Sequence, residues 1–148
     1  MQYAVKLGLK GQVEKISNQD ELPMADFIYQ QVECSIFEKV NAKGLSSGYV
    51  LVVDEEGSFK ELPTINPFGS WLYGFQEHGC PILGIALILK LVFTSDGPDF
   101  SFLNEQEADI LAAWLEERRP IMMRDMQRAI ARFDDNIIVF EEDSDDDV

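Results

Sequence analysis

Two long apolar runs dominate the pattern of hydrophobic and polar positions along this chain. They cover residues 49–53 and 84–93, and neither shows a regular alternation with polar residues. Continuous apolar runs of this length are typical of strands that are buried on both faces. An acidic turn at residues 54–57 follows the first run, and Gly57 provides the backbone freedom that such turns often need. We therefore expect these two strands to form the centre of the core.

Shorter segments predict further strands around this centre. Apolar residues alternate with others at residues 3–9, which is the two-residue period of a half-buried strand, and a turn at Lys10 and Gly11 leads to a return strand at 13–16. Residues 35–40 predict another strand. Residues 58–62 alternate again, and we expect them to pair with the 49–53 strand in a hairpin.

Two short helices are predicted between the strands. Helical spacing of Met24, Phe27 and Ile28 after an early proline predicts a helix over residues 21–32. A second helix is predicted over residues 67–73. Asn66 is a suitable N-cap there, Pro67 fits the first turn, and the helix is expected to end before the next glycine.

The pattern changes at residues 95–99, where we predict a boundary followed by helix. Asn104 and Glu107 have the spacing of a capping box, and Ile110 and Trp114 are predicted on one apolar face. Pro120 is expected to break or kink the helix, because proline lacks the amide hydrogen that helices need. Residues 137–140 predict an edge strand or an anchor, and the almost purely acidic end after them predicts disorder.

Together these elements predict an α+β fold with a small mixed or antiparallel sheet and two short helices. The 148 residues are 46% hydrophobic, which is sufficient for one compact domain with an appended element. We place the core domain at residues 1–95 and a C-terminal helical extension at 98–133. Residues 134–148 form a short apolar segment with an acidic tail.

The net charge of −15 constrains the partners of the chain. Such a charge repels nucleic acids and anionic membranes at long range and attracts basic proteins. All five arginines lie within residues 118–132, beside an acidic tail. We favour local pairing of these arginines with acids such as Glu116, Glu117 and Asp125. The alternative is a basic contact site that the acidic tail masks.

No catalytic residue, metal ligand or cofactor is assigned from the sequence. His78 and Cys80 share a loop, but a loop histidine and a small buried thiol explain them better than a nucleophile or a zinc site. Cys34 and Cys80 are expected to be free thiols. The carboxylates at residues 54–56 are expected to be solvated in their turn. We find no membrane span and no signal-peptide pattern, so we expect a cytoplasmic protein.

An aromatic cluster in the connection between the two central strands is the best place for a ligand. Trp71, Tyr73 and Phe75 follow one another closely there, and core packing is the favoured interpretation. The alternative is a pocket formed by residues 62–84, in which Asn66, Trp71, Tyr73 and His78 bind a nucleotide or metabolite.

The central stretch also resembles a known family. The resemblance lies in residues 51–57, Leu62-Pro63, Asn66-Pro67 and the spacing of Gly79, Pro81, Ile82 and Gly84 before an apolar strand. These features are similar to the family called domain of unknown function 3846, small proteins of bacteria, phages and conjugative elements. The resemblance covers residues 1–95. It implies an opening strand, turn and short helix, offers no catalytic residue, and implies a context of accessory proteins of mobile DNA.

We therefore predict a non-enzymatic accessory protein that acts by binding another protein. One specific form is a DNA mimic, whose carboxylates occupy a nuclease or another DNA-binding protein. The alternative is the small-ligand-binding domain described above. A Met-rich helical segment with Met122, Met123 and Met126 also leaves a homodimer open.

Overall fold

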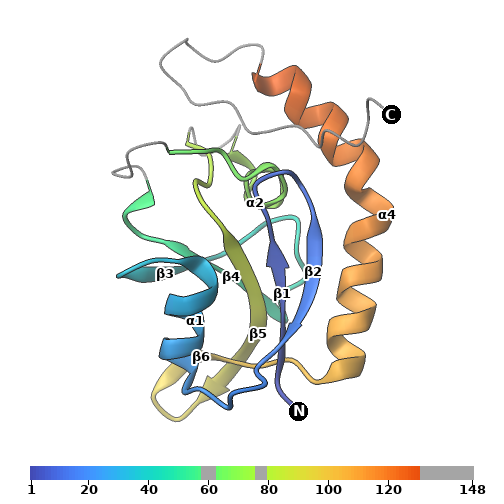
Figure 1. Cartoon of the computed structure of the whole chain (residues 1–148). Helices are drawn as coiled ribbons and strands as arrows, with labels where there is room; N and C mark the ends of the chain where they lie inside the picture. Colours follow the sequence, from blue (N-terminus) through green and yellow to red (C-terminus); the bar gives the residue numbers. More distant parts are fainter. Residues whose placement is uncertain (58–62, 76–79, 131–148) are drawn as a thin grey trace.

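The computed structural model describes residues 1–57, 63–75 and 80–130, which form one antiparallel sheet flanked by helices (Figure 1). This arrangement confirms the predicted α+β class. The strands are β1 (Tyr3–Leu7), β2 (Val13–Ser17), β3 (Phe37–Val40), β4 (Tyr49–Asp54), β5 (Ala86–Thr94) and β6 (Gly97–Ser101). The helices are α1 (Met24–Val32), α2 (Pro67–Tyr73) and α4 (Glu105–Ile130).

The sheet has the order β2-β1-β5-β4-β3, with β6 paired to the far half of β5. Every pairing is antiparallel. The two apolar runs of the sequence form β4 and β5, which are neighbours, and Leu51, Val52, Leu87 and Ile88 are fully buried. The prediction that these runs form the centre of the core is confirmed.

Each face of the sheet is covered by different helices, so the molecule has three layers. Leu51, Ala86 and Ile88 point to the face that α2 and α4 cover. Their neighbours Leu87 and Val52 point to the opposite face, under α1. Figure 1 shows α1 and α4 on opposite sides of the sheet. The alternation of side chains along a strand thus supplies both cores from the same continuous apolar runs.

Helix α2 has the bounds that the sequence predicts. The side-chain oxygen of Asn66 accepts a hydrogen bond from the Gly69 amide at 2.8 Å, and Pro67 occupies the first turn. Gly74 ends the helix with a φ of 80°, a conformation that glycine adopts without strain. Helix α1 starts three residues later than predicted, because Pro23 is its N-cap.

The predicted boundary at residues 95–99 is wrong. This segment turns the chain into β6, whose register with β5 runs from Lys90↔Ser101 to Thr94↔Gly97. Glycine and proline mark both domain boundaries and hairpin turns, and only the long-range pairing distinguishes the two. The helix after β6 begins at Glu105. Its capping box is confirmed, because Asn104 and Glu107 each accept a hydrogen bond from the backbone amide of the other, at 2.8 and 2.9 Å.

The predicted break at Pro120 is also wrong, since Pro120 lies inside α4, one helix of 26 residues. Pro120 cannot donate to the carbonyl of Glu116. Both residues lie on the exposed side of the helix, where water can bond to that carbonyl. Leu115 and Met122 are fully buried on either side of the proline and hold the helix against the sheet.

Other predictions concern the cysteines and the remaining segments. Cys34 and Cys80 are not joined in a disulfide, as expected, but Cys80 is exposed, so the expectation of a buried thiol is wrong there. The predicted strand at 58–62 and the segment at 134–148 lie outside the described residues. Within the described part of the chain, no helix is both long and apolar enough to cross a membrane.

Candidate functional site

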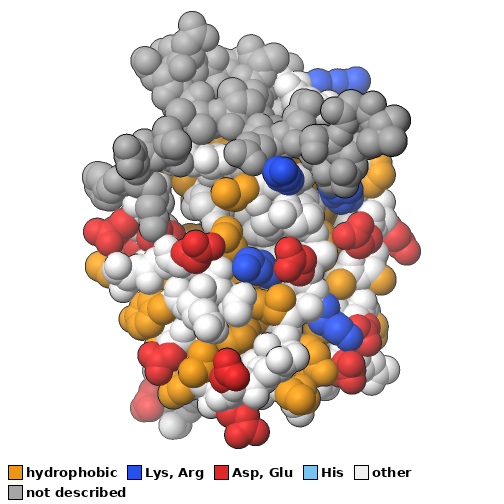
Figure 2. Space-filling model, in the orientation of Figure 1, with side chains coloured by type: hydrophobic (Ala, Val, Ile, Leu, Met, Phe, Trp, Pro, Cys, Tyr) orange, Lys and Arg blue, Asp and Glu red, His pale blue; other side chains and the backbone are white. Residues whose placement is uncertain are grey.

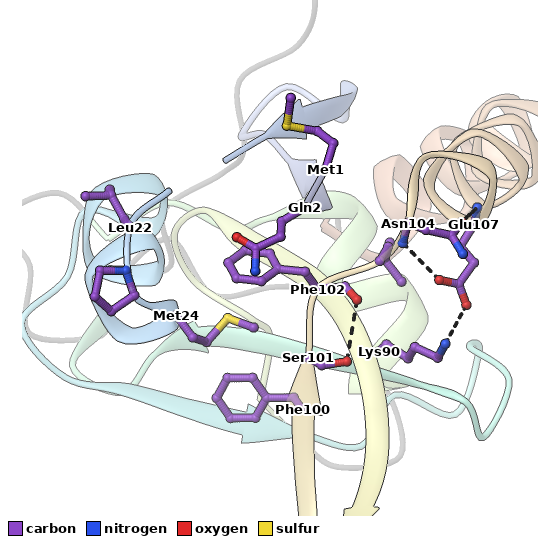
Figure 3. A pocket seen from close by; sticks show the side chains of 12 residues that line it. Met1, Gln2, Leu22, Met24, Lys90, Phe100, Ser101, Phe102, Asn104 and Glu107 are labelled. Atoms are coloured by element: carbon purple, nitrogen blue, oxygen red, sulfur yellow. Dashed lines mark hydrogen bonds and ion pairs between the residues drawn. The ribbon is translucent and has the colours of Figure 1, made fainter. Parts of the chain in front are cut away.

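A groove forms where the N-terminal strand and the end of β6 meet. Tyr3 and Leu103 exchange two backbone hydrogen bonds of 2.9 and 2.8 Å, which places residues 1–2 beside the link from β6 to α4. The start of α1 lies across from Asn104, at the end of this link (Figure 3). The space between them has a volume of about 570 Å³ (Figure 3).

One wall of the groove is apolar and preformed. It consists of Leu22, Pro23, Met24, Phe100 and Phe102. Phe102 packs edge-on against Phe27 with ring centroids 5.0 Å apart, and Phe100 packs edge-on against Phe37 at 6.1 Å. These contacts fix the two rings of the wall through the α1 side of the core.

A buried asparagine holds the start of α1 in place. The Asn18 side chain is 2% exposed, donates to the carbonyl of Leu22 at 2.9 Å and accepts from the Leu22 amide at 3.0 Å. It also donates to the Gln2 side chain at 2.9 Å. The loop between β2 and α1 is thus tied to the N-terminal segment, and both border the groove. No local pattern in the sequence predicts the bonds of Asn18 to Gln2 and Leu22, because these partners come together only in the folded chain.

The opposite wall carries an ion pair that the helix cap positions. Glu107 accepts from the Asn104 amide with one carboxylate oxygen, and its other oxygen lies 2.9 Å from the Lys90 ammonium (Figure 3). Two hydrogen bonds hold the pKa of Glu107 below its usual value. The bond from the Asn104 amide has the larger effect, and the bond from the Lys90 side chain has the next largest. This wall therefore presents a carboxylate at neutral pH, close to a lysine.

Further acids lie close in the sequence to residues that line the groove. Asp20, Glu21 and Asp26 are all exposed on the α1 side, and residues 16–38 contain no lysine or arginine. On the α4 side, Lys15 lies 3.3 Å from Glu105 and 2.6 Å from Asp109. We call the three acids Asp20, Glu21 and Asp26 the acidic rim. Figure 2 shows acidic and apolar side chains side by side over the α1 region of this face.

Asn66, which the sequence proposed as a ligand-binding residue, serves the fold instead. Its side chain is fully buried, and its amide nitrogen donates to the carbonyls of Leu7 and Gly84, both at 2.9 Å. Its oxygen caps α2 through Gly69. These bonds tie α2 to β1 and to the segment before β5, and leave no exposed atom for a ligand.

The aromatic residues of α2 also pack within the protein. Trp71 donates from its indole nitrogen to the Asp125 carboxylate at 3.0 Å and packs edge-on against Phe68. Trp71 and Tyr73 both pack against the core cluster beneath α4. Core packing is therefore the role that the structure shows for them. His78 lies outside the described residues.

A second, smaller hollow of about 200 Å³ lies between α4 and the loop before β4. Its lining is mainly apolar and consists of Leu45, Ser46, Tyr49, Ile110, Leu111 and Trp114. Ile110 and Trp114, which the sequence places on one apolar face, both line this hollow, although Ile110 is 61% exposed. The guanidinium of Arg118 lies 3.9 Å from the centre of the Trp114 ring. The hollow brings few polar groups together.

The remaining candidate groups are the carboxylates at residues 54–56, the possible metal ligands and the arginines of α4. Glu55 and Glu56 are exposed in their turn, as expected. The expectation of a solvated carboxylate is wrong for Asp54, which is 8% exposed and accepts from the Glu56 amide at 2.9 Å. No group of three or more His, Cys, Asp or Glu side chains arranged to hold a metal occurs within residues 1–57, 63–75 and 80–130. Arg118 lies 3.7 Å from Glu117, and Arg124 lies 3.6 Å from Asp125, which fits local pairing of the arginines.

Comparisons with models of protein families, with curated proteins and with solved structures found no match for this chain. The resemblance to domain of unknown function 3846 therefore rests on the residues quoted above alone.

Proposed function

We propose that this chain is a non-enzymatic accessory protein that acts by binding a basic protein. The net charge of −15 supports the proposal, together with the exposed acids of the acidic rim. Complementary charge accelerates encounter and excludes wrong partners, and a stretch of 23 residues without a base keeps the local field negative. The same field disfavours direct binding to nucleic acid or to an anionic membrane.

A DNA mimic is the specific form of this function that we favour. In such a protein, surface carboxylates take the positions of DNA phosphates on a nuclease or another DNA-binding protein. The exposed acids of the rim supply the charge, and the context of mobile DNA implied by the family resemblance supports this form. The basic surface of a DNA-binding protein is the complement that these carboxylates require.

A pull-down from host lysate at low and at moderate salt tests the proposal. We expect basic proteins to be retained at low salt and released as salt rises, because screening weakens contacts between exposed charges. If no basic protein is retained even at low salt, the proposal is wrong.

The ligand-binding alternative lacks a comparable observation. Asn66 and Trp71 use polar atoms within the protein, and the pocket proposed at residues 62–84 depended on them. Thermal-shift screening with nucleotides and metabolites measures this alternative directly, because a ligand that binds only the folded state raises the melting temperature. A reproducible, concentration-dependent rise would favour the ligand-binding function.

A further inference from the structure

We propose that two copies of this chain pair through α4, with the two helices antiparallel and Ile121 of each copy seated in the hollow beside Trp114 of the other. The inference goes beyond the proposed function and does not rest on it. Since α1 and α4 lie on opposite sides of the sheet, such a pair leaves the α1 side free (Figure 1).

The outer side of α4 carries apolar side chains at positions that face solvent. Ile110 and Ile121 are 61% and 48% exposed, Ala113 is exposed, and Trp114 is half-buried. Residues 110, 114, 117 and 121 recur at the spacing of three and four residues that one helix face has. From Ile110 to Ile121 this stripe is about 16 Å long. Its spacing is that of a helix that packs against a second helix.

The methionines of α4 do not supply this contact. Met122 and Met126 are fully buried, and Met123 is half-buried. A homodimer through these side chains, which the sequence left open, would require α4 to leave its own core. The contact therefore uses the exposed side of the helix.

The hollow beside Trp114 provides the seat for the second copy. It has a volume of about 200 Å³ and a mainly apolar lining, and the Arg118 guanidinium holds one side of the Trp114 ring at 3.9 Å from its centre. Ile121 lies about 10 Å further along the helix. In an antiparallel pair, Ile121 of each copy reaches the hollow of the other when the twofold axis passes between Glu117 and Arg118.

The charges of α4 favour the antiparallel arrangement. Residues 105–117 contain acids and no lysine or arginine, and Glu117 is exposed at their end. Residues 118–130 contain more arginines than acids, and Arg124 is exposed among them. An antiparallel pair places each half against the opposite half of the other helix, so that Glu117 meets Arg118 across the axis. A parallel pair would place acids against acids.

Sedimentation velocity of the full chain over a series of concentrations tests the inference. It is run at an ionic strength of about 0.15 M, where the Debye length of about 8 Å screens the long-range repulsion between two chains of net charge −15. We expect a reversible shift from monomer to dimer in the micromolar range, as befits an interface of one helix and one hollow. A chain that stays monomeric at about 0.5 mM would overturn the inference.

Matched variants locate the interface. Ile121→Lys and Ile36→Lys make the same change at positions that are 48% and 46% exposed, on α4 and next to the edge strand β3. We expect I121K to weaken the dimer at least about tenfold and I36K to weaken it less than about twofold. Circular dichroism verifies both folds, and Ile121→Ala replaces I121K if that variant does not fold. Equal weakening by the two variants would exclude α4 as the interface.

Two charge variants test the antiparallel arrangement. Glu117→Arg and Arg118→Glu each place like charges across the axis, so each alone should dimerise at least about threefold more weakly than the wild type. A mixture of E117R and R118E should recover, because arginine again faces glutamate. In a parallel pair each variant only exchanges one pair of like charges for another, so unchanged dimerisation of both variants would contradict the arrangement. Because no basic partner is present, the pull-down tests the proposed function independently of this result.

Discussion

Single buried asparagines hold the segments that shape this molecule. Asn66 and Asn18 are 0% and 2% exposed, and each bonds to backbone groups of a distant or neighbouring segment. The sequence predicted the capping role of Asn66, because an asparagine before a proline is a local pattern. It did not predict the bonds to Leu7 and Gly84, because these partners come together only in the folded chain.

Replacing Asn66 by alanine should be among the more destabilising polar substitutions. The change removes the cap of α2 and leaves the carbonyl of Leu7 without its donor, so we expect a loss of at least about 2 kcal/mol in the free energy of unfolding. Chemical denaturation measures it. The exposed cap variant Asn104→Ala is the control, with an expected loss of about 1 kcal/mol. Equal losses in the two variants would contradict the bridging role of Asn66.

Glu107 should make a pH-dependent contribution to stability. Its pKa is lowered in the folded chain from the ordinary value of 4.5, so its stabilisation is present above that pH and is lost as the pH falls through the folded pKa. At neutral pH we expect Glu107→Gln to cost about 0.5 kcal/mol, since glutamine keeps the capping box but loses the charge. The difference from wild type should vanish in acid. Unfolding measured over a pH series tests this, and a constant difference would contradict it.

At the scale of elements, helix α4 shows how packing overrides a local pattern. The sequence predicted a break or a kink at Pro120 from the missing amide alone, and the helix does not break there. Leu115, Met122 and Met126 are fully buried on the face toward the sheet, and this burial stabilises a single continuous helix. No local pattern distinguishes a proline that ends a helix from one on the exposed side of a well-packed helix.

Pro120→Ala should therefore stabilise the protein. Alanine restores an amide donor and is favoured over proline by up to about 3 kcal/mol inside a helix, so we expect a gain of about 1–3 kcal/mol. Thermal unfolding measures the gain as a higher melting temperature. Glu116→Ala, on the same exposed side, is the control and should change stability by less than about 0.5 kcal/mol. A lower melting temperature for P120A would show that the packing of α4 requires the proline.

The hairpin of β5 and β6 places the end of the sheet beyond the boundary that the sequence suggested. A chain ending at residue 95 lacks β6, Leu103 and the α4 residues Leu111 and Leu115, which belong to the core. We expect this fragment to remain unfolded, because one face of its sheet has lost most of its cover. Circular dichroism and a thermal melt test it. A cooperative transition in the fragment would restore the boundary at 95.

At the scale of the whole molecule, the sequence predicted the fold class better than it predicted the candidate functional site. Alternation and apolar runs predicted the α+β class and the central strands, because burial repeats along each strand. Strand order was not predicted, since pairing across long separations leaves no local pattern. The groove combines residues 1–2, 22–24, 90, 100–104 and 107, which only the folded chain brings together. Asn66 and Trp71, by contrast, were candidate ligand-binding residues in the sequence, but their polar side-chain atoms form hydrogen bonds within the protein.

The measurement that tests the central claim most directly compares three chains in the pull-down at low salt. They are the wild type, a rim variant (D20N, E21Q, D26N) and a control variant (E55Q, E56Q, E117Q) whose net charge changes equally but away from the groove. Circular dichroism verifies the fold of each. We predict that the control retains basic proteins nearly as the wild type does, whereas the rim variant retains far less, because the position of the acids matters as well as their number. Equal retention by the two variants, or no retention by the wild type, would contradict the account.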